Sequence, residues 1–281
     1  MLFSIIDFAN MELDMKEFKF WQVDAFTDEP FRGNPAAIFI LNENLQDELM
    51  LKIAKEMNLS ETAFLLLKPD ANPYLRWFTP MFEIDLCGHA TLATAHICFS
   101  ELKTFTAEVT FETKYAGPLK VLNNKNSLTM DFPSRPGKIK RFGDIPKFVY
   151  RALSDTNPVF VKKSRDLMLV YDNEDTVLNM KPDFNALLHY DGFIIATAKS
   201  ENPNYDFVSR FFCATDGILE DPVTGSAHST LTPYWSEMLN KKHLRAFQAS
   251  ERGGFLDLKM NHDRVDISGN AVTIFEGKMK I

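Results

Sequence analysis

One stretch of the chain decides the fold: Glu83-Ile84-Asp85-Leu86-Cys87-Gly88-His89-Ala90-Thr91-Leu92-Ala93-Thr94-Ala95-His96-Ile97-Cys98-Phe99. From Gly88 onward no charged residue occurs until Glu101, and apolar residues fall on every side of a helical wheel. A helix that is apolar all round belongs inside a protein. This one is too short, and too rich in Thr and His, to cross a membrane. The sequence therefore predicts a helix buried at the centre of a domain.

The start of this predicted helix has a chemical consequence. It begins at Gly88, which small and polar residues follow. The first N–H groups of a helix lack partners within the helix and carry partial positive charge. Such an end, held inside a domain, is suited to binding a carboxylate or a phosphate. We therefore expect an anion-binding position near Gly88.

A second copy of the pattern lies near the other end of the chain. Arg76-Trp77-Phe78 precedes the first copy, and Arg210-Phe211-Phe212 precedes Asp221-Pro222-Val223-Thr224-Gly225-Ser226-Ala227-His228. The two glycines, at positions 88 and 225, are 137 residues apart, about half of the 281-residue chain. This spacing indicates internal duplication. Chance is the alternative, because each motif is short.

The composition bounds the class of protein. Hydrophobic residues make up 45% and charged residues 25%, as in soluble globular proteins. With a net charge of −7 and no basic cluster, neither nucleic acid nor a membrane is expected as a partner. Three cysteines do not make a disulfide framework and favour a reducing, cytoplasmic location. Residues 1–15 are not typical of a signal peptide, and we interpret them as a tail or a mis-called start before Met15.

Short strands outnumber helices in the predicted pattern. They include a strand at Lys103–Tyr115, and each half has one dominant buried helix, the second at Ser226–Leu239. This mixture indicates an α+β fold rather than an alternating fold with a parallel sheet.

A lone carboxylate interrupts one predicted strand, Leu59-Ser60-Glu61-Thr62-Ala63-Phe64-Leu65-Leu66-Leu67. In a strand Glu61 shares its face with Ala63 and Leu65. If that face is covered, desolvation raises the pKa of Glu61, which suits proton transfer near neutral pH. The alternative is a glutamate at a strand edge that reaches solvent or pairs with an arginine.

Several other chemistries are disfavoured. No dinucleotide or phosphate-loop fingerprint is present, so no nucleotide cofactor is expected. His89 and His96 lie two helical turns apart, ~10 Å along the axis, which is too far for one metal ion. No Gly-x-Ser-x-Gly motif occurs, which disfavours a hydrolase. Cys87 beside a helix start suits a thiolate base, but Thr224 stands at its place in the second copy, which excludes a two-thiol racemase.

What remains is a set of acids and donors near two helix starts. If the halves face each other, Gly88 and Gly225 flank one cleft, and substrate sites often form between domains. Backbone N–H groups there, with Ser226 and His89, are then expected to hold a substrate carboxylate. Glu61 and Asp221 are the candidates to move a proton. Two alternatives stay open: Asp221 as a helix cap, and His89 bonded to a nearby carbonyl.

Seven motifs, in order, resemble those of the PhzF-like phenazine-biosynthesis isomerase family: Val23-Asp24-Ala25-Phe26-Thr27, Gly33-Asn34-Pro35, Ser60-Glu61-Thr62-Ala63-Phe64, Trp77-Phe78-Thr79-Pro80, Asp85-Leu86-Cys87-Gly88-His89-Ala90-Thr91, Asp221-Pro222-Val223-Thr224-Gly225-Ser226-Ala227-His228 and Gln248-Ala249-Ser250-Glu251-Arg252-Gly253-Gly254. The resemblance implies a fold similar to diaminopimelate epimerase. We expect two similar domains, each a curved mixed β-sheet or barrel around a central helix, with the site between them. The expected domains are 16–125 and 126–271, with the last strand, 272–281, completing the first.

The resemblance also implies a function. It points to a cofactor-independent isomerase of a small carboxylate, in which Glu61 moves a proton as on trans-2,3-dihydro-3-hydroxyanthranilate. It further implies a homodimer in which Asp221, His89 and Ser226 bind the substrate and assist. We also expect Gly88, Gly225, Asn34 and Thr224 to bind the substrate. One alternative is an epimerase or racemase that uses Glu61 and Asp221 from opposite faces. The other is a metabolite-binding protein without turnover.

Overall fold

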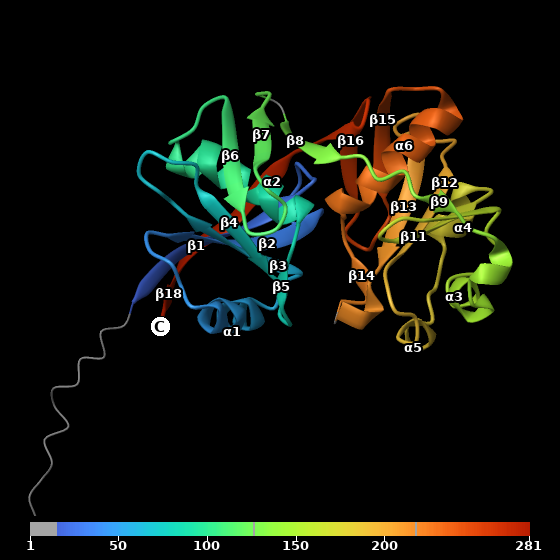
Figure 1. Cartoon of the computed structure of the whole chain (residues 1–281), viewed down its shortest axis with the longest axis horizontal. Coiled ribbons are helices and arrows are strands. Elements are labelled where there is room, and N and C mark those ends of the chain that lie inside the picture. The colour runs from blue at the N-terminus through green and yellow to red at the C-terminus, as the bar shows by residue number, and fades with distance from the viewer. Residues whose placement is uncertain (1–15, 126, 217) are drawn as a thin grey trace, which may run out of the picture.

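The computed structural model describes residues 16–125, 127–216 and 218–281, so the predicted tail at 1–15 lies outside the described residues. Two similar halves lie side by side, and each encloses one helix (Figure 1). In the first half this helix is α2 (Gly88–Ile97), and in the second it is α6 (His228–Leu239). The predicted α+β fold of two similar, duplicated domains is confirmed.

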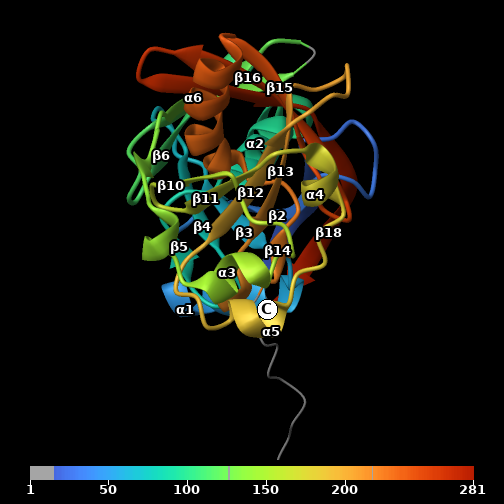
Figure 2. The ribbon, with the colours of Figure 1, turned by 90° about the vertical axis from the view of Figure 1, so that its right-hand side faces the viewer.

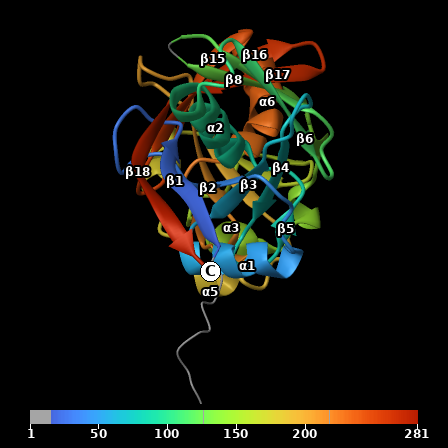
Figure 3. The same ribbon diagram turned by 90° about the vertical axis from the view of Figure 1, so that its left-hand side faces the viewer.

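The first half is a curved mixed sheet around α2. Its strands in chain order are β1 (Glu17–Ala25), β2 (Asn34–Leu41), β3 (Glu61–Leu66), β4 (Tyr74–Phe78) and β5 (Glu83–Ile84). β2 and β3 are parallel, whereas β1–β2, β3–β4 and β4–β5 are antiparallel. The C-terminal strand β18 (Ala271–Lys280) returns to this half and pairs antiparallel with β1 (Figure 3).

The second half continues the sheet. β6 (Glu108–Thr113) and β7 (Leu119–Asn123) still lie in the first half beside α2, and β8 (Leu128–Pro133) leads across to the second half (Figure 1). The strands of the second half are β9 (Lys138–Ile139), β10 (Phe160–Lys163), β11 (Leu167–Tyr171), β12 (Ile194–Lys199), β13 (Phe207–Phe212), β14 (Glu220–Asp221), β15 (His243–Gln248), β16 (Gly254–Asn261) and β17 (Arg264–Gly269). β6 pairs with both β4 and β7, and β8 pairs with both β7 and β17. Pairing therefore crosses the predicted boundary after residue 125, and the boundaries themselves stay a prediction.

Short helices cover the outer faces. α1 (Asp47–Met57) links β2 to β3, and its apolar stripe packs on Phe39 and Phe64. It ends at Asn58, which takes the left-handed conformation. In the second half α3 (Lys147–Arg151), α4 (Glu174–Leu178) and α5 (Phe184–Leu187) form a separate apolar cluster with β11, β12 and β13 (Figure 2).

α2 is buried as predicted. Every residue from Gly88 to Ile97 is buried except His96, because the helix packs against strands on several sides: β1, β2, β3, β8 and β18. The turn Cys98–Leu102 then extends the helix with π-helical geometry and ends at Lys103 in the left-handed conformation. The predicted strand at Lys103–Tyr115 is therefore too long, and β6 begins only at Glu108.

An arginine–glutamate ion pair occurs at equivalent places in the two halves and gives further evidence of the duplication. In the first half the guanidinium of Arg76 binds Glu83 through Nε–Oε1 (2.6 Å) and Nη2–Oε2 (2.7 Å). In the second half Arg210 binds Glu220 through the same atoms, at 2.7 Å each. Both glutamates precede the repeated glycine by five positions, 83 to 88 and 220 to 225. From these glutamates to the helix starts, the two copies therefore align without a gap.

Candidate active site

The starts of the two central helices meet at Gly88 and Gly225. A short 3-10 turn, Gly225–Ala227, leads directly into α6. A Cβ atom on Gly88 would lie 3.0 Å from the Cα of Gly225, and one on Gly225 would lie 3.2 Å from the Cα of Gly88. Only glycine permits so close an approach of two backbones. The helix starts of the two halves therefore converge, as expected from the sequence.

A cavity of about 320 Å³ adjoins this contact and takes its walls from both halves. Its lining residues are Glu61, Thr79, Phe82, Glu83, Ile84, Asp85, Leu86, Arg165, Phe193, Phe211, Cys213, Ile218, Asp221, Thr224 and Ser226. Four predicted site residues are among them: Glu61, Asp221, Thr224 and Ser226. The other four, Asn34, Gly88, His89 and Gly225, are not among the lining residues.

Glu61 is the first residue of β3, and its side chain is 16% exposed at the cavity. The carboxylate oxygen Oε2 lies 3.1 Å from Nε2 of His89, which is the second residue of α2. Glu61 is thus a largely buried acid in contact with a buried imidazole, rather than a solvated glutamate at a strand edge.

The protonation of His89 follows from its neighbours. Its Nδ1 lies 2.9 Å from the amide nitrogen of Asn34, which has protons to donate but no lone pair to offer. Nδ1 therefore accepts, and the ring proton sits on Nε2, on the side of Glu61. Burial lowers the pKa of His89 to about 3. His89 is therefore a neutral ring, not an imidazolium, and its Nε2 lies 3.1 Å from Oε2 of Glu61 without the alignment of a hydrogen bond.

Asn34 connects His89 to Asp221 across the junction of the halves. Its amide nitrogen also lies within hydrogen-bond distance of Oδ1 of Asp221 (2.7 Å) and of the carbonyl of Val223 (3.0 Å), so its two protons are shared among three acceptors. Oδ2 of Asp221 accepts from the hydroxyl of Thr224. Burial raises the pKa of Asp221, and the hydrogen bonds from Thr224 and Asn34 oppose that rise. Both oxygens of Asp221 thus bind side chains, so the helix-cap alternative does not describe it.

Strand register shows which residues occupy equivalent places in the two halves. Arg76 lies opposite Phe64 on β3, and Arg210 lies opposite Ala196 on β12. Three residues earlier in the sequence stand Glu61 (64 − 3), the first residue of β3, and Phe193 (196 − 3), directly before β12. These two positions are therefore equivalent. One residue after Glu83 and Glu220 stand Ile84 and Asp221. Neither Glu61 nor Asp221 has an acidic counterpart in the other half.

Sequence reasoning missed Arg165 and Asp166, which lie between β10 and β11. Arg165 lines the cavity and donates to both oxygens of Asp166, at 2.8 and 2.9 Å, and to Oγ of Ser226 at 3.0 Å. Two adjacent opposite charges are typical of an ordinary turn and indicate no cavity. The apolar wall of the cavity was also missed, because its residues come from four separate segments of the chain: Phe82, Phe193, Phe211 and Ile218.

Glu61, Cys87 and His89 place possible ligand atoms within 4.8 Å of one another. However, Cys87 Sγ lies 3.5 Å from Nδ1 of His89, whereas Glu61 lies at Nε2. Burial, followed by the charge of Glu61, raises the pKa of the Cys87 thiol well above its usual range. A thiol that stays protonated is a poor base. His96, the other histidine of α2, has its Nε2 3.0 Å from the hydroxyl oxygen of Thr273.

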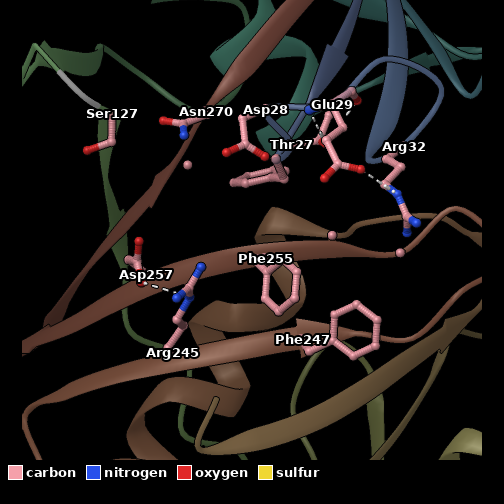
Figure 4. A pocket seen from close by; sticks show the side chains of 14 residues that line it. Thr27, Asp28, Glu29, Arg32, Ser127, Arg245, Phe247, Phe255, Asp257 and Asn270 are labelled. Carbon is pink, nitrogen blue, oxygen red and sulfur yellow. Dashed lines mark hydrogen bonds and ion pairs between the residues drawn. The ribbon is translucent and has the colours of Figure 1, made fainter. Parts of the chain in front are cut away.

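A larger cavity, of about 470 Å³, lies elsewhere in the molecule (Figure 4). Its lining includes Phe247 and Phe255, together with ion pairs of Glu29 with Arg32 (3.0 Å) and of Arg245 with Asp257 (3.7 Å). None of the predicted site residues lines it. The groups with proton-transfer chemistry are therefore at the smaller cavity.

Within the described ranges, no helix combines the length and the hydrophobicity needed to cross a membrane.

Duplicated halves around two central helices, joined at a cavity that bears acids, define an isomerase of the epimerase-like structural class. A hydroxyproline epimerase from Agrobacterium vitis shares this fold, with a TM-score of 0.58 at 9% identity, covering 94% of this chain and 93% of that chain.

The chain belongs to the PhzC–PhzF family of phenazine biosynthesis-like proteins, whose family model matches residues 23–277. It is 45% identical over 262 residues to an uncharacterised isomerase of Halalkalibacterium halodurans, covering 92% of this chain and 96% of that protein. It is also similar to the crystal structure of a PhzF-family phenazine biosynthesis protein from Enterococcus faecalis. The TM-score is 0.88 at 41% identity, covering 95% of this chain and 100% of that one.

Proposed function

We propose that this isomerase works without a cofactor and that Glu61 moves a proton between two positions of a small carboxylate substrate. Its reaction is then similar to that of trans-2,3-dihydro-3-hydroxyanthranilate isomerase. One observation carries the proposal: Glu61 is a largely buried acid at the cavity, and the neutral imidazole of His89 lies 3.1 Å from its carboxylate. A positioned carboxylate in such a place is suited to general acid–base catalysis.

The proposed step conserves every atom of the substrate. The Glu61 carboxylate removes a proton from a carbon beside an unsaturated group. The electron pair left behind shifts along the conjugated system, so that the double bond moves. Glu61, now protonated, returns the proton to a different carbon and is regenerated as a carboxylate. Before and after the transfer, when Glu61 is charged, the nearby Nε2 proton of His89 stabilises the carboxylate.

The asymmetry of the halves supports a single acid–base residue over the epimerase alternative. A two-base epimerase needs a second acid or base on the opposite face of the substrate. The place equivalent to Glu61 holds Phe193, and both oxygens of Asp221 already accept hydrogen bonds from Asn34 and Thr224. We therefore assign Asp221 the role of holding the junction and orienting Asn34.

The test is deuterium incorporation from D2O into a panel of small unsaturated carboxylic acids that includes trans-2,3-dihydro-3-hydroxyanthranilate. For the substrate that reacts, we expect migration of the double bond with one solvent deuterium gained. Glu61→Gln should fold normally and lower the rate about 10³-fold. Glu56→Gln, an exposed glutamate of α1, is the matched control and should react at the wild-type rate.

Three outcomes contradict the proposal. Exchange that persists in Glu61→Gln excludes Glu61 as the acid–base residue. Scrambled stereochemistry without migration of the double bond supports the epimerase alternative. Tight binding of a panel member without any exchange supports the non-catalytic alternative.

We also propose that the protein is a cytoplasmic homodimer. Light scattering on the purified chain tests the assembly, because a dimer has twice the 32.2 kDa mass of one chain.

A further inference from the structure

The contact between Gly88 and Gly225 raises the question of which groups meet a substrate carboxylate. The two glycines pack against each other and are not among the residues that line the cavity. The polar side chains that the second half presents there are Arg165, Asp221, Thr224 and Ser226. Among the described lining residues, Arg165 is the only Lys, Arg or His.

The guanidinium of Arg165 is held in one orientation. It donates from Nε and Nη2 to the two oxygens of Asp166, whose side chain is 2% exposed. Nη2 also donates to Ser226 Oγ at 3.0 Å. No described residue accepts a hydrogen bond from Nη1, and the Arg165 side chain is 31% exposed. The edge of the guanidinium that carries Nε and Nη2 is therefore fixed to the protein, while Nη1 stays available to a ligand.

The contact with Arg165 also orients the hydroxyl group of Ser226. Its Oγ accepts from Arg165, so its own hydroxyl proton is directed to another acceptor. Nη1 of Arg165 and the hydroxyl of Ser226 are thus two neighbouring donors at one wall. A carboxylate, with its two oxygens, matches such a pair of donors.

The charge of the cavity requires a cation for any anionic substrate. Among its acids, Glu83 is bound by Arg76 (2.6 Å) and Lys114 (2.7 Å). Asp85, Asp221 and Glu61 also line the wall and repel a carboxylate. Arg165, whose charge is partly offset by Asp166, is the one cationic side chain of the described lining that opposes this repulsion.

Arg165 also lies beside the position that, in the second half, is equivalent to that of Glu61. Its guanidinium carbon lies 5.9 Å from the ring centroid of Phe193, the counterpart of Glu61 in the second half. One half thus supplies the acid, and the other supplies a cation above an aromatic ring. The two halves have therefore diverged since the duplication: the first carries the proposed proton-transfer residue, and the second carries the cation for substrate binding.

We propose that Arg165, with Ser226, binds the substrate carboxylate and makes the enzyme select acids over their neutral analogues. The substrate class is a small carboxylic acid with a flat, apolar body, which packs on Phe193 and Phe211. This assignment rests on the proposed function for the carboxylate substrate, but it does not depend on the role of Glu61.

The test compares benzoate with benzamide, which has the same shape and no charge, by ligand-observed NMR titration. Wild-type protein should bind benzoate about 10- to 100-fold more tightly than benzamide, the range expected for a charge-assisted hydrogen bond. Arg165→Gln should remove this preference and leave the binding of benzamide unchanged. Arg165→Lys keeps the charge but not the fork, and should give an intermediate preference.

The matched control is Arg245→Gln, which changes an arginine of the larger cavity and should keep the wild-type preference. A purely structural role for Arg165 predicts equal losses for benzoate and benzamide, and this result would overturn the proposal. So would an unchanged preference in Arg165→Gln, or no detectable binding of benzoate to the wild type. Glu61→Gln should bind benzoate at least as tightly as the wild type, so failure of either assignment can be told from failure of the other.

Discussion

His89 is the residue whose charge state decides how Glu61 acts. Because its pKa is lowered to about 3 by burial, His89 stays neutral from pH 8 down to about pH 4. A protonated His89 would pair with Glu61 as an ion pair and make it a weaker base. The neutral ring instead places the Nε2 proton 3.1 Å from the carboxylate. In the proposed mechanism His89 is therefore a positioning residue for Glu61.

At this scale we predict a rate profile without a histidine inflection. Between pH 5 and 8, kcat should show no step near pH 6.5, the usual pKa of histidine. His89→Ala should lower kcat about 10²-fold, as loss of one preorganised donor does, with little change in KM. His89→Gln, which still has a proton to donate, should recover part of the rate. A step near pH 6.5 that disappears in His89→Gln would show that His89 titrates and would contradict this assignment.

At the scale of elements, the contact of the two helix starts sets the width of the site. Gly88→Ala would place a Cβ 3.0 Å from the Cα of Gly225, so one start must move. We expect a loss of about 1–3 kcal/mol in the free energy of unfolding, as overpacking usually causes. Because Glu61 and Ser226 lie on opposite sides of this contact, kcat/KM should fall about 10²-fold.

The control for this prediction is Gly143→Ala, since a Cβ on Gly143 meets no atom within 4 Å. Urea unfolding and kcat/KM should both stay at wild-type values in that variant. If Gly88→Ala and Gly143→Ala behave alike, the close approach of the helix starts has no functional role.

The elements themselves were largely predictable, for reasons of local chemistry. α2 could be predicted because it carries no charge before Glu101, and β3 because its apolar run is interrupted only near its start. The second helix was predicted at Ser226–Leu239, and the structure has a 3-10 turn and α6 over Gly225–Leu239. The short helices α3, α4 and α5 were harder to predict, since four or five residues carry too little periodicity to be distinguished from a loop.

At the scale of the whole molecule, two buried histidines make stability depend on pH. Burial lowers the pKa of His89 to about 3 and that of His228 to about 4, both below the usual 6.5. Below pH 6.5 these two histidines bind protons in the unfolded chain but stay unprotonated in the folded protein. The free energy of unfolding therefore falls as the pH decreases. Each histidine contributes a loss of about 2 kcal/mol by pH 5, at about 1.4 kcal/mol per pH unit.

We therefore predict a loss of roughly 4 kcal/mol in the free energy of unfolding between pH 7 and pH 5. The raised pKa of Asp221 acts in the opposite direction and reduces this loss. His228→Gln, which leaves Glu61 and His89 in place, should lower the loss by about half. Urea unfolding at the two pH values measures it, and an equal loss in the variant and the wild type would contradict the prediction.

The candidate site was predictable only in part. Glu61 and Asp221 stand out in the sequence because each is an acid at the edge of an apolar or small-residue motif. Arg165 does not stand out, because its importance arises from distance: it reaches Ser226, 61 residues away in sequence, and faces the wall that bears Glu61. Contacts between segments so far apart are properties of the folded chain, and no local pattern encodes them.

The central claim is that the cavity at the junction of the halves binds a carboxylate beside Glu61. A crystal structure of the protein with bound benzoate tests it most directly. We predict that the carboxylate lies about 3 Å from Arg165 Nη1 and Ser226 Oγ, with the ring on Phe193 and Glu61 on the far side. Benzoate bound instead in the larger cavity beside Phe255, or a Glu61 side chain turned out to solvent, would contradict the claim.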